Sequence, residues 1–193
     1  MTQAAPIPDR SEAILNAAFQ AFATYGYRRT SMDDIAKGSG MSRTALYLHY
    51  RNKEDIFRSL AQQYFDQTML DMKVALNQPG QTVKQALYGC FLAKDGKFMD
   101  IVLTTPHGAE LLDAGFAVSG DVAAAAETRM AEILARWLDD NGLPPDLGPA
   151  VDFAETVVAA LKGLKSSVKS IEALRASEDR LAGLIAMALS AKP

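Results

Sequence analysis

The stretch SMDDIAKGSGMSRTALYLHYRNKED, which runs from Ser31 to Asp55, decides the fold of this protein. Its first part, Met32 to Lys37, has the pattern of a short helix, Gly38-Ser39-Gly40 interrupts it, and a second short helix opens at Ser42. Two short helices joined by a Gly-containing turn of three or four residues form a helix-turn-helix, whose second helix enters the DNA major groove. The stretch therefore predicts a DNA-reading module.

Two further helices frame this module. The segment from Ser11 to Tyr25 repeats apolar residues with helical spacing, and Gly26 can end it in a left-handed conformation. On the other side, Asn52 and Asp55 form a capping pair at the start of a long amphipathic helix, which the breakers at 77–80 terminate. The pattern predicts a three-helix domain followed directly by a long helix.

The rest of the chain is expected to be helical as well, because no segment sustains the two-residue alternation of a strand. The predicted fold class is all-α: an N-terminal three-helix helix-turn-helix domain joined by the long helix to a C-terminal helical bundle. We divide the chain into a flexible N-terminus over 1–8, the helix-turn-helix domain over 9–55 and the C-terminal domain over 56–193. Local breakers place the later helices at about 82–93, 97–104, 107–114, 121–140, 150–170 and 174–190.

The charge distribution supports a nucleic-acid interface in the N-terminal part. The 193 residues carry a net charge of −3, but residues 1–60 hold eight Lys/Arg against six Asp/Glu, a balance of +2. Residues 61–193 hold twelve against seventeen, a balance of −5. The small basic excess coincides with the helix-turn-helix, as a surface that faces phosphates requires.

The composition indicates a cytoplasmic protein. No apolar run approaches the roughly 18 residues that a membrane helix needs, so we expect no membrane association. The N-terminus lacks the basic flank and apolar block of a signal peptide. Cys90 is the single cysteine and lies among apolar residues, which predicts a reduced, packed thiol.

Residues 9–60 resemble the N-terminal domain of the tetracycline-repressor (TetR) family of bacterial transcription regulators. The resemblance implies a homodimer that places two reading helices in successive major grooves of a palindrome-like, double-stranded operator. Beyond residue 60, the chain is similar to the family in being helical and of suitable length. The matching positions are Ile14-Leu15, Ala17-Ala18-Phe19, Phe22, Tyr25-Gly26-Tyr27, Thr30-Ser31-Met32, Ile35-Ala36, Gly38 to Ser42, Ala45-Leu46-Tyr47, His49-Tyr50 and Asn52-Lys53-Glu54.

The resemblance also implies which residues contact DNA. Arg43 is expected to form two hydrogen bonds to a guanine edge, and Thr44 to touch a thymine methyl group or a base edge. Tyr47 is expected beside them, at a base, a phosphate or the groove wall. A solvated surface position is the alternative for Ser31 and His49. The expected phosphate contacts, which position the protein without reading sequence, are Thr30, Ser31, Ser42, His49 and Lys53.

The C-terminal domain is expected to bind a small molecule. Aromatic and Met side chains at helical spacing can line an apolar pocket, and the family resemblance favours one here, although plain core is the alternative. Such a pocket suits an apolar or aromatic ligand with one or two polar groups. The candidate lining residues are Tyr64, Phe65, Met69, Phe91, Phe98, Val102, His107, Phe116, Met130 and Trp137.

The last two predicted helices are apolar or small on most sides, and such helices require burial on most sides. A four-helix dimer interface, with two helices from each subunit about a two-fold axis, meets that requirement. The alternative is that these helices only close the core of one subunit. The candidate interface residues are Val157, Val158, Leu161, Leu164, Leu181, Leu184, Ile185 and Leu189.

These features predict a dimeric transcription regulator, more specifically a repressor that a small apolar ligand releases from its operator. The first alternative is a constitutive DNA-binding regulator without an inducer, and the second is an all-helical enzyme or carrier. Catalysis has no support, because no phosphate-binding loop, dinucleotide fingerprint or nucleophile elbow occurs. We assign no catalytic residue, metal or cofactor, since His107 and Glu110 have no second ligand pair.

Overall fold

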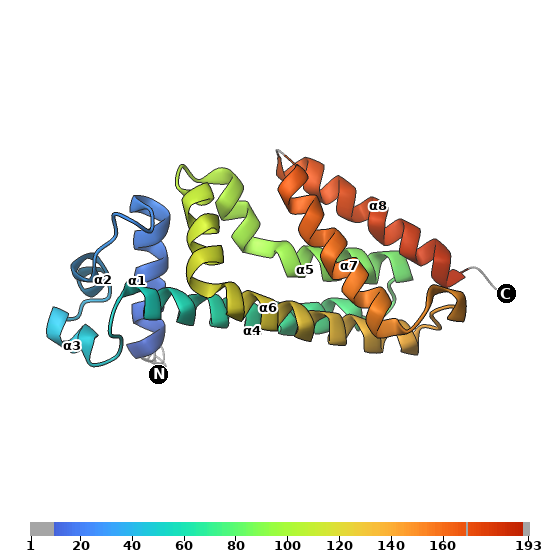
Figure 1. The fold of residues 1–193 in the computed structure, drawn as a ribbon, viewed down its shortest axis with the longest axis horizontal. Helices are drawn as coiled ribbons and strands as arrows, with labels where there is room; N and C mark the ends of the chain where they lie inside the picture. Colours follow the sequence, from blue (N-terminus) through green and yellow to red (C-terminus); the bar gives the residue numbers. More distant parts are fainter. Residues whose placement is uncertain (1–9, 169, 191–193) are drawn as a thin grey trace, which may run out of the picture. The chain divides into compact units, whose positions relative to one another are not determined.

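The computed structural model describes residues 10–168 and 170–190, apart from the side chains of 95–103 and 116. Within these residues every regular element is helical, as the sequence predicts; the expectation for 1–8 lies outside them. None of the described helices combines the length and apolar character needed to cross a bilayer. The elements in Figure 1 are α1 (Arg10–Tyr25), α2 (Met32–Gly38), α3 (Arg43–Tyr47), α4 (Lys53–Leu76), α5 (Val83–Thr104), α6 (Gly108–Asp140), the short 3₁₀ helix η1 (Pro145–Leu147), α7 (Ala150–Ser167) and α8 (Ile171–Ser190).

The first of two compact units comprises residues 10–63 and 104–122, so it contains α1 to α3, the start of α4 and the start of α6. α2 packs against α1. Three aromatic rings of this unit form a cluster. The centroid of the Tyr27 ring lies 5.4 Å from that of Phe22 and 5.1 Å from that of Phe57. The predicted helix-turn-helix domain therefore shares its unit with a segment from much later in the chain.

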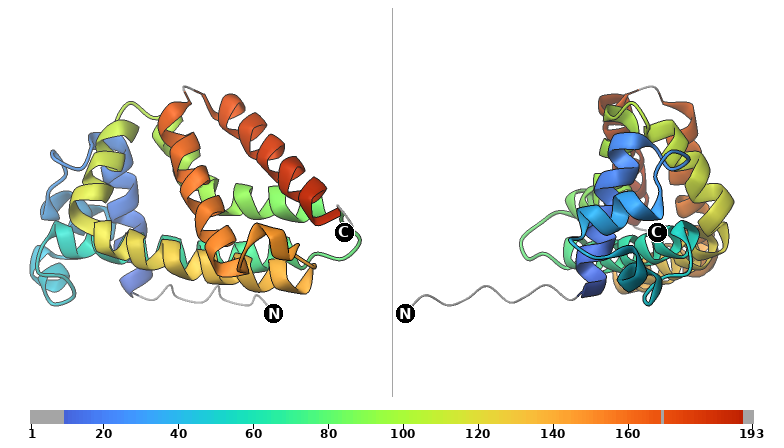
Figure 2. Two further views of the ribbon diagram at one scale, coloured as in Figure 1. Left: turned by 45° about the vertical axis from the view of Figure 1, so that its right-hand side comes forward. Right: turned by 90° about the vertical axis from the view of Figure 1, so that its left-hand side faces the viewer.

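The second unit comprises residues 64–103 and 123–190. The remainders of α4 and α6, with α5, α7 and α8, enclose a single apolar core. α8 leads back toward the end at which α7 begins (Figure 2). The largest fully buried side chains of this core are Phe91, Met72, Leu87, Met130, Leu134, Leu138 and Leu161.

Two predicted helix breaks are wrong. α5 continues through Asp95-Gly96, where the sequence predicts a gap between two helices. α6 likewise runs through Ser119-Gly120, although Ser119 has φ −130° and ψ 22°, so a kink remains where a loop is expected. Helix packing outweighs the weak local preference of a single Gly or Ser against helix.

Candidate nucleic-acid interface

Side-chain caps fix the start of α2 and the start of α3. Ser31 Oγ accepts a hydrogen bond from the Asp34 N–H at 3.3 Å, and Asp34 Oδ2 accepts one from the Ser31 N–H at 2.9 Å, which completes a capping box. Gly40 then takes φ +68°, a left-handed conformation that favours glycine. Ser42 Oγ accepts from the Ala45 N–H at 3.1 Å and so caps α3. These local bonds set the direction of α3.

Burial on one side determines which face of α3 is turned outward. Ile35 of α2, Leu46 of α3 and Ile56 of α4 are fully buried. Gly38, at the end of α2, lies so close to α1 that a Cβ there would be 3.2 Å from Ala17 Cβ. Because Leu46 occupies the buried side of this five-residue helix, the opposite side faces outward.

The outward face of α3 carries all of the predicted base-reading residues. Leu48, which directly follows α3 and was not among the predicted contacts, is also open to solvent, at 84% exposed. Its signal in the sequence is its position two residues after the buried Leu46, which turns it away from the core. The predicted residues, all exposed, are Arg43, Thr44 and Tyr47.

Arg43 is held by an acidic residue on the neighbouring helix. Its Nη1 donates to Asp33 Oδ1 at 3.1 Å and to Asp33 Oδ2 at 3.0 Å. Its Nη2 donates to the Tyr47 hydroxyl at 3.5 Å, and the guanidinium carbon lies 5.5 Å from the centre of the Tyr47 ring. The hydrogen bond to Tyr47 and the negative charge of Asp33 both raise the pKa of Arg43. Asp33 is a part of this site that the sequence pattern does not reveal.

The predicted phosphate contacts divide into exposed and buried residues. Ser31, Ser42 and His49 are exposed near the outward face of α3. Thr30 is only 2% exposed, and its Oγ1 lies 2.7 Å from the Gly26 carbonyl oxygen and 3.1 Å from that of Ala21. The Thr30 hydroxyl therefore caps the carboxyl end of α1, and this burial does not support a phosphate contact through it.

Lys53, the first residue of α4, holds the turn between α1 and α2. Its Nζ donates to the carbonyl oxygens of Tyr27, Arg28 and Thr30 at 2.8, 3.0 and 3.1 Å. The same Nζ lies 4.7 Å from the centre of the Tyr27 ring. An ammonium has three donors, so these bonds commit all of them to the protein.

The N-terminal segment that builds this interface matches a known family. Residues 14–60 match the family described as bacterial regulatory proteins, tetR family, over α1 to α3 and the start of α4. The DNA-binding region of this chain is therefore that of the tetR family. The resemblance drawn from the sequence is thereby confirmed, and the chain has the DNA-binding region of a transcription regulator.

The chain is similar to known transcription regulators along most of its length. The HTH-type transcriptional repressor ComR of Escherichia coli is 25% identical over 174 residues, which cover 82% of this chain and 79% of ComR. Two solved structures share the fold at 18% identity. A transcriptional regulator from Rhodococcus has a TM-score of 0.69, with 95% of this chain and 99% of that chain covered. The TetR family repressor AlkX from Dietzia, implicated in biodegradation of n-alkanes, has a TM-score of 0.61, with 93% and 96% covered.

The start of α6 reaches the same turn that Lys53 holds. Glu110 Oε1 accepts a hydrogen bond from the Arg28 N–H at 2.6 Å, and His107 Nδ1 lies 3.8 Å from Glu110 Oε2. Further along α6, Arg58 of α4 forms two hydrogen bonds to the carboxylate of Asp121, at 2.7 and 2.6 Å. His107 therefore belongs to the unit of the helix-turn-helix, whereas the other described candidates for the ligand pocket belong to the second unit.

Most of these other pocket candidates pack in the core of the second unit. Phe65 packs against this core. Trp137 Nε1 donates a hydrogen bond to the carbonyl oxygen of Leu76 at 3.0 Å, and the Tyr64 hydroxyl donates one to the carbonyl oxygen of Lys94 at 3.2 Å. Whether any of them line a ligand cavity stays a prediction. The side chains of Phe98, Val102 and Phe116 lie outside the described residues. The fully embedded candidates are Met69, Phe91, Met130 and Trp137.

The second unit also buries polar side chains that have no signal in the sequence. Thr68, Lys94 and Glu178 are at most 6% exposed. Cys90 is the packed free thiol that the sequence predicts, and its burial raises its pKa to about 12. Long polar side chains at apolar helical spacing look like solvated positions in a sequence, so their burial has no local signal.

Most of the predicted dimer residues face the core of their own subunit. Only Leu184, at 60% exposed, lies open to solvent. Leu164, Leu181 and Leu189 are partly buried against the core. The buried residues among them favour the alternative given by the sequence, since they pack in the monomer core. These are Val157, Val158, Leu161 and Ile185.

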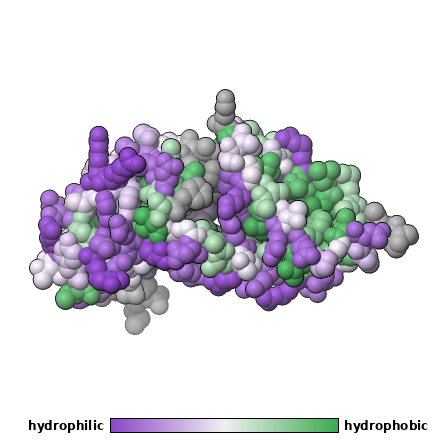
Figure 3. All heavy atoms as spheres, viewed as in Figure 1, coloured by the Kyte–Doolittle hydropathy of each residue, from purple (hydrophilic) through white to green (hydrophobic). Residues whose placement is uncertain are grey.

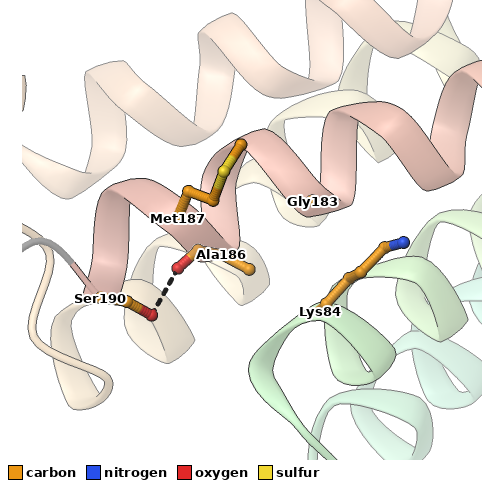
Figure 4. A pocket seen from close by; sticks show the side chains of 5 residues that line it. All are labelled: Lys84, Gly183, Ala186, Met187 and Ser190. Carbon is orange, nitrogen blue, oxygen red and sulfur yellow. Dashed lines mark hydrogen bonds between the residues drawn. The ribbon is translucent and has the colours of Figure 1, made fainter.

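α7 and α8 also carry apolar side chains that are open to solvent, which we call the open face of these helices. Val151 and Met187 are 50% and 63% exposed. Figure 3 shows apolar surface gathered over this part of the second unit. A shallow hollow of about 550 Å³ borders α8, lined by Lys84 of α5 and by Gly183, Ala186, Met187 and Ser190 (Figure 4).

Proposed function

We propose that this regulator binds a palindrome-like operator as a homodimer and represses transcription until a small apolar or aromatic ligand releases it. One observation supports the DNA-binding role above all. In α3 only Leu46 is buried, while Arg43, Thr44 and Tyr47 are exposed. A helix supported in this way can enter the major groove while its core contacts stay intact.

The base contacts follow from the exposed side chains of α3. A guanidinium can form two hydrogen bonds to O6 and N7 of guanine, so Arg43 is assigned to a guanine. Thr44 offers a hydroxyl and a methyl group to the adjacent base pair. Leu48 offers an apolar surface that suits the methyl group of thymine. Tyr47 lines the groove beside Arg43, to which it is hydrogen-bonded.

The backbone contacts are assigned to exposed hydroxyl and imidazole groups. Ser42 and His49 are exposed and can donate to phosphates, Ser42 with the hydroxyl proton that its cap does not use. Ser31 is exposed too, but its hydroxyl already donates to Asp34 Oδ2, so a phosphate contact there requires that bond to open. Lys53 acts on DNA through the turn that it holds, because its three donors are already bonded to the carbonyl oxygens of that turn. Its replacement would therefore weaken binding by loosening the domain.

Dimerisation is assigned to the open face of α7 and α8. Leu184 and Met187 supply apolar area, while the exposed Ala159, Ala160 and Gly163 of α7 allow close approach of a second helix pair. An isologous four-helix interface uses the same face of both subunits. When competent to bind, the dimer holds its two α3 helices about 34 Å apart, one turn of B-DNA.

Release by a ligand requires two conformers that differ in this spacing. One conformer binds the operator and the other does not. To move nearly all molecules from the first to the second, the ligand must bind the second conformer more strongly by roughly 5 kcal/mol. The repressor role is supported by the likeness to ComR, which is named a transcriptional repressor. An apolar ligand is supported by the composition of the second unit's core.

Constitutive DNA binding is the second candidate. Met69, Phe91, Met130 and Trp137 pack together as core in this structure, which is what a regulator without an inducer requires. Thermal unfolding with a panel of apolar and aromatic compounds separates the two candidates. A compound that raises the unfolding temperature and also dissociates the protein from DNA supports the inducible repressor.

The DNA-binding role is tested with the intergenic DNA upstream of the protein's own gene. Binding of wild type, Arg43→Ala and the control Arg136→Ala is measured at one stated salt concentration. Arg136 is also exposed, but it lies on α6 in the second unit. Loss of a bidentate base contact of about 1–3 kcal/mol lowers affinity roughly 5- to 150-fold in Arg43→Ala. Equal binding by all three proteins would refute the assignment of α3.

A further inference from the structure

The ion pair between Asp33 and Arg43 joins the two helices of the helix-turn-helix on its exposed side. The residues are ten positions apart, and both carboxylate oxygens of Asp33 lie within 3.1 Å of Arg43 Nη1. The side chain of Arg43 is 60% exposed and that of Asp33 is 48% exposed. The pair therefore lies at the surface that approaches DNA under the proposed function.

Stability does not account for this pair. Exposed ion pairs contribute little to folding, because solvent screens them and two side chains lose freedom. The cap of α2 needs no help from Asp33, since the neighbouring Asp34 fills the capping box with Ser31. An acidic side chain on a surface that meets phosphates also opposes binding through charge repulsion. Asp33 is favourably placed in the first turn of α2, but so is Asp34; what distinguishes Asp33 is its contact with Arg43.

Asp33 and Tyr47 together restrict the guanidinium of Arg43. Asp33 occupies Nη1, the Tyr47 hydroxyl accepts from Nη2, and the Tyr47 ring lies against the group. Among the described residues, none bonds to Nε of Arg43. The Nε–H and the second hydrogen of Nη2 therefore remain for DNA, and an edge of Nε and Nη2 has the fork geometry that bonds O6 and N7 of a guanine.

We propose that Asp33 is a positioning residue that determines specificity: it holds Arg43 for one guanine and keeps its charge from phosphates at other sequences. This inference rests on the proposed function, in which α3 reads the operator. An arginine without a partner can rotate to a nearby phosphate on any DNA. Arg43 must first break its bonds to Asp33 to do so, which penalises non-operator DNA more than the operator.

The test compares wild type with Asp33→Asn, which keeps the size of the side chain and removes its charge. Asp113→Asn is the matched control, because Asp113 is an exposed acid of the same unit on α6. Fluorescence anisotropy is measured across a range of salt concentrations. The probes are the operator fragment, the same fragment with each base pair changed in turn, and an unrelated duplex.

Asp33→Asn is expected to bind the unrelated duplex about three- to tenfold more tightly, with a salt dependence steeper by about one counterion. Discrimination at the single guanine read by Arg43 is expected to fall about three- to tenfold, and the other positions to keep theirs. In an Arg43→Ala background, Asp33→Asn is expected to leave that discrimination unchanged. Asp113→Asn is expected to behave as wild type.

The inference is overturned if Asp33→Asn keeps the wild-type ratio of operator to unrelated binding and the wild-type salt slope. It is equally overturned if both DNAs are weakened alike, because that pattern belongs to a merely structural role. Failure of the proposed function has a different signature, since Arg43→Ala would then also leave every base preference unchanged. If Arg43→Ala alters a preference and Asp33→Asn does not, only the role of Asp33 fails.

Discussion

The carboxylate of Glu110, in the first turn of α6, accepts a hydrogen bond from the backbone N–H of Arg28 at 2.6 Å. Arg28 lies in the turn between α1 and α2, and Lys53 of α4 binds the carbonyl oxygens of the same turn. Backbone donors and acceptors of this turn are therefore satisfied by side chains from two later helices. The position of the DNA-binding helices thus depends on residues far downstream in the first unit.

Replacement of Glu110 by Ala should loosen this turn. The lost bond is charge-assisted but partly exposed, so we expect a loss of about 1 kcal/mol in the free energy of unfolding. Hydrogen exchange at the amide of Arg28 should accelerate, which is a local measure of the same change. Asp113→Asn removes a carboxylate of α6 that is turned to solvent and should leave both values unchanged. An unaltered amide at Arg28 in Glu110→Ala would show that the bond does not form in solution.

Gly26→Ala should be more destabilising than Gly40→Ala, although both glycines have positive φ, +82° and +68°. A Cβ at Gly26 would collide with the Glu110 carboxylate and lie 3.1 Å from His107 Nδ1, whereas a Cβ at Gly40 meets nothing within 4 Å. Left-handed backbone alone costs about 1–2 kcal/mol in both variants. The excess at Gly26 should shrink in the double variant Gly26→Ala/Glu110→Ala. Chemical denaturation of wild type, the three single variants and the double variant checks this, and equal losses at the two glycines would contradict the contact.

Tyr27 should remain protonated in the folded protein well above pH 10. Burial of its hydroxyl, assisted by the negative charge of Glu54, raises the pKa of Tyr27 to about 12. In the unfolded chain the group loses its proton at about pH 10, so unfolding releases a proton between the two values. The contribution of Tyr27 to stability is therefore complete below about pH 10 and declines as the pH rises toward 12.

Tyr27→Phe isolates this effect from other groups that titrate in alkali. The Tyr27 hydroxyl is buried and has no hydrogen-bond partner among the described residues, so its removal should leave stability at pH 7 unchanged or improve it by up to about 1 kcal/mol. Between pH 10 and 12, the variant should lose less stability than wild type. Ultraviolet titration of the folded proteins measures the ionisation directly. Identical alkaline stability curves would show that Tyr27 is not protected.

Local chemistry explains which parts of the fold and site the sequence predicts. The capping box of Ser31 and Asp34 and the cap at Ser42 are formed by residues three positions apart, so the ends of α2 and α3 are encoded where they occur. Leu46 has apolar partners at helical spacing, which predicts its burial and the outward direction of Arg43. The DNA-reading face is therefore accessible from the sequence.

Longer-range contacts explain the rest. Thr30 turns its hydroxyl back to carbonyl groups four and nine residues earlier, and Asp33 meets Arg43 across a turn. Neither contact leaves a periodic pattern in the sequence from which it could be predicted. α7 and α8 are apolar on opposite sides, and periodicity alone does not reveal which side meets the subunit's own core. For this reason Val157 and Ile185 were assigned to a dimer interface although they are buried within the monomer.

The open face of α7 and α8 gives the final prediction. Leu184→Glu and Met187→Glu should convert a dimer into monomers at micromolar concentration, because association would bury one carboxylate from each subunit without a partner. Both side chains are at least 60% exposed, so the folded monomer should tolerate the change with little loss in unfolding temperature. Sedimentation velocity measures the association, and weaker operator binding should accompany its loss.

Two comparisons separate this interface from general effects. Val74→Glu places the same charge on α4, where Val74 is 69% exposed, and should leave the dimer intact. Ile185→Ala should lower the free energy of unfolding by about 2–4 kcal/mol, because Ile185 fills the core of its own subunit. If Val74→Glu dissociates the dimer while Leu184→Glu does not, the interface lies on α4. In that case the apolar face of α8 must have another role.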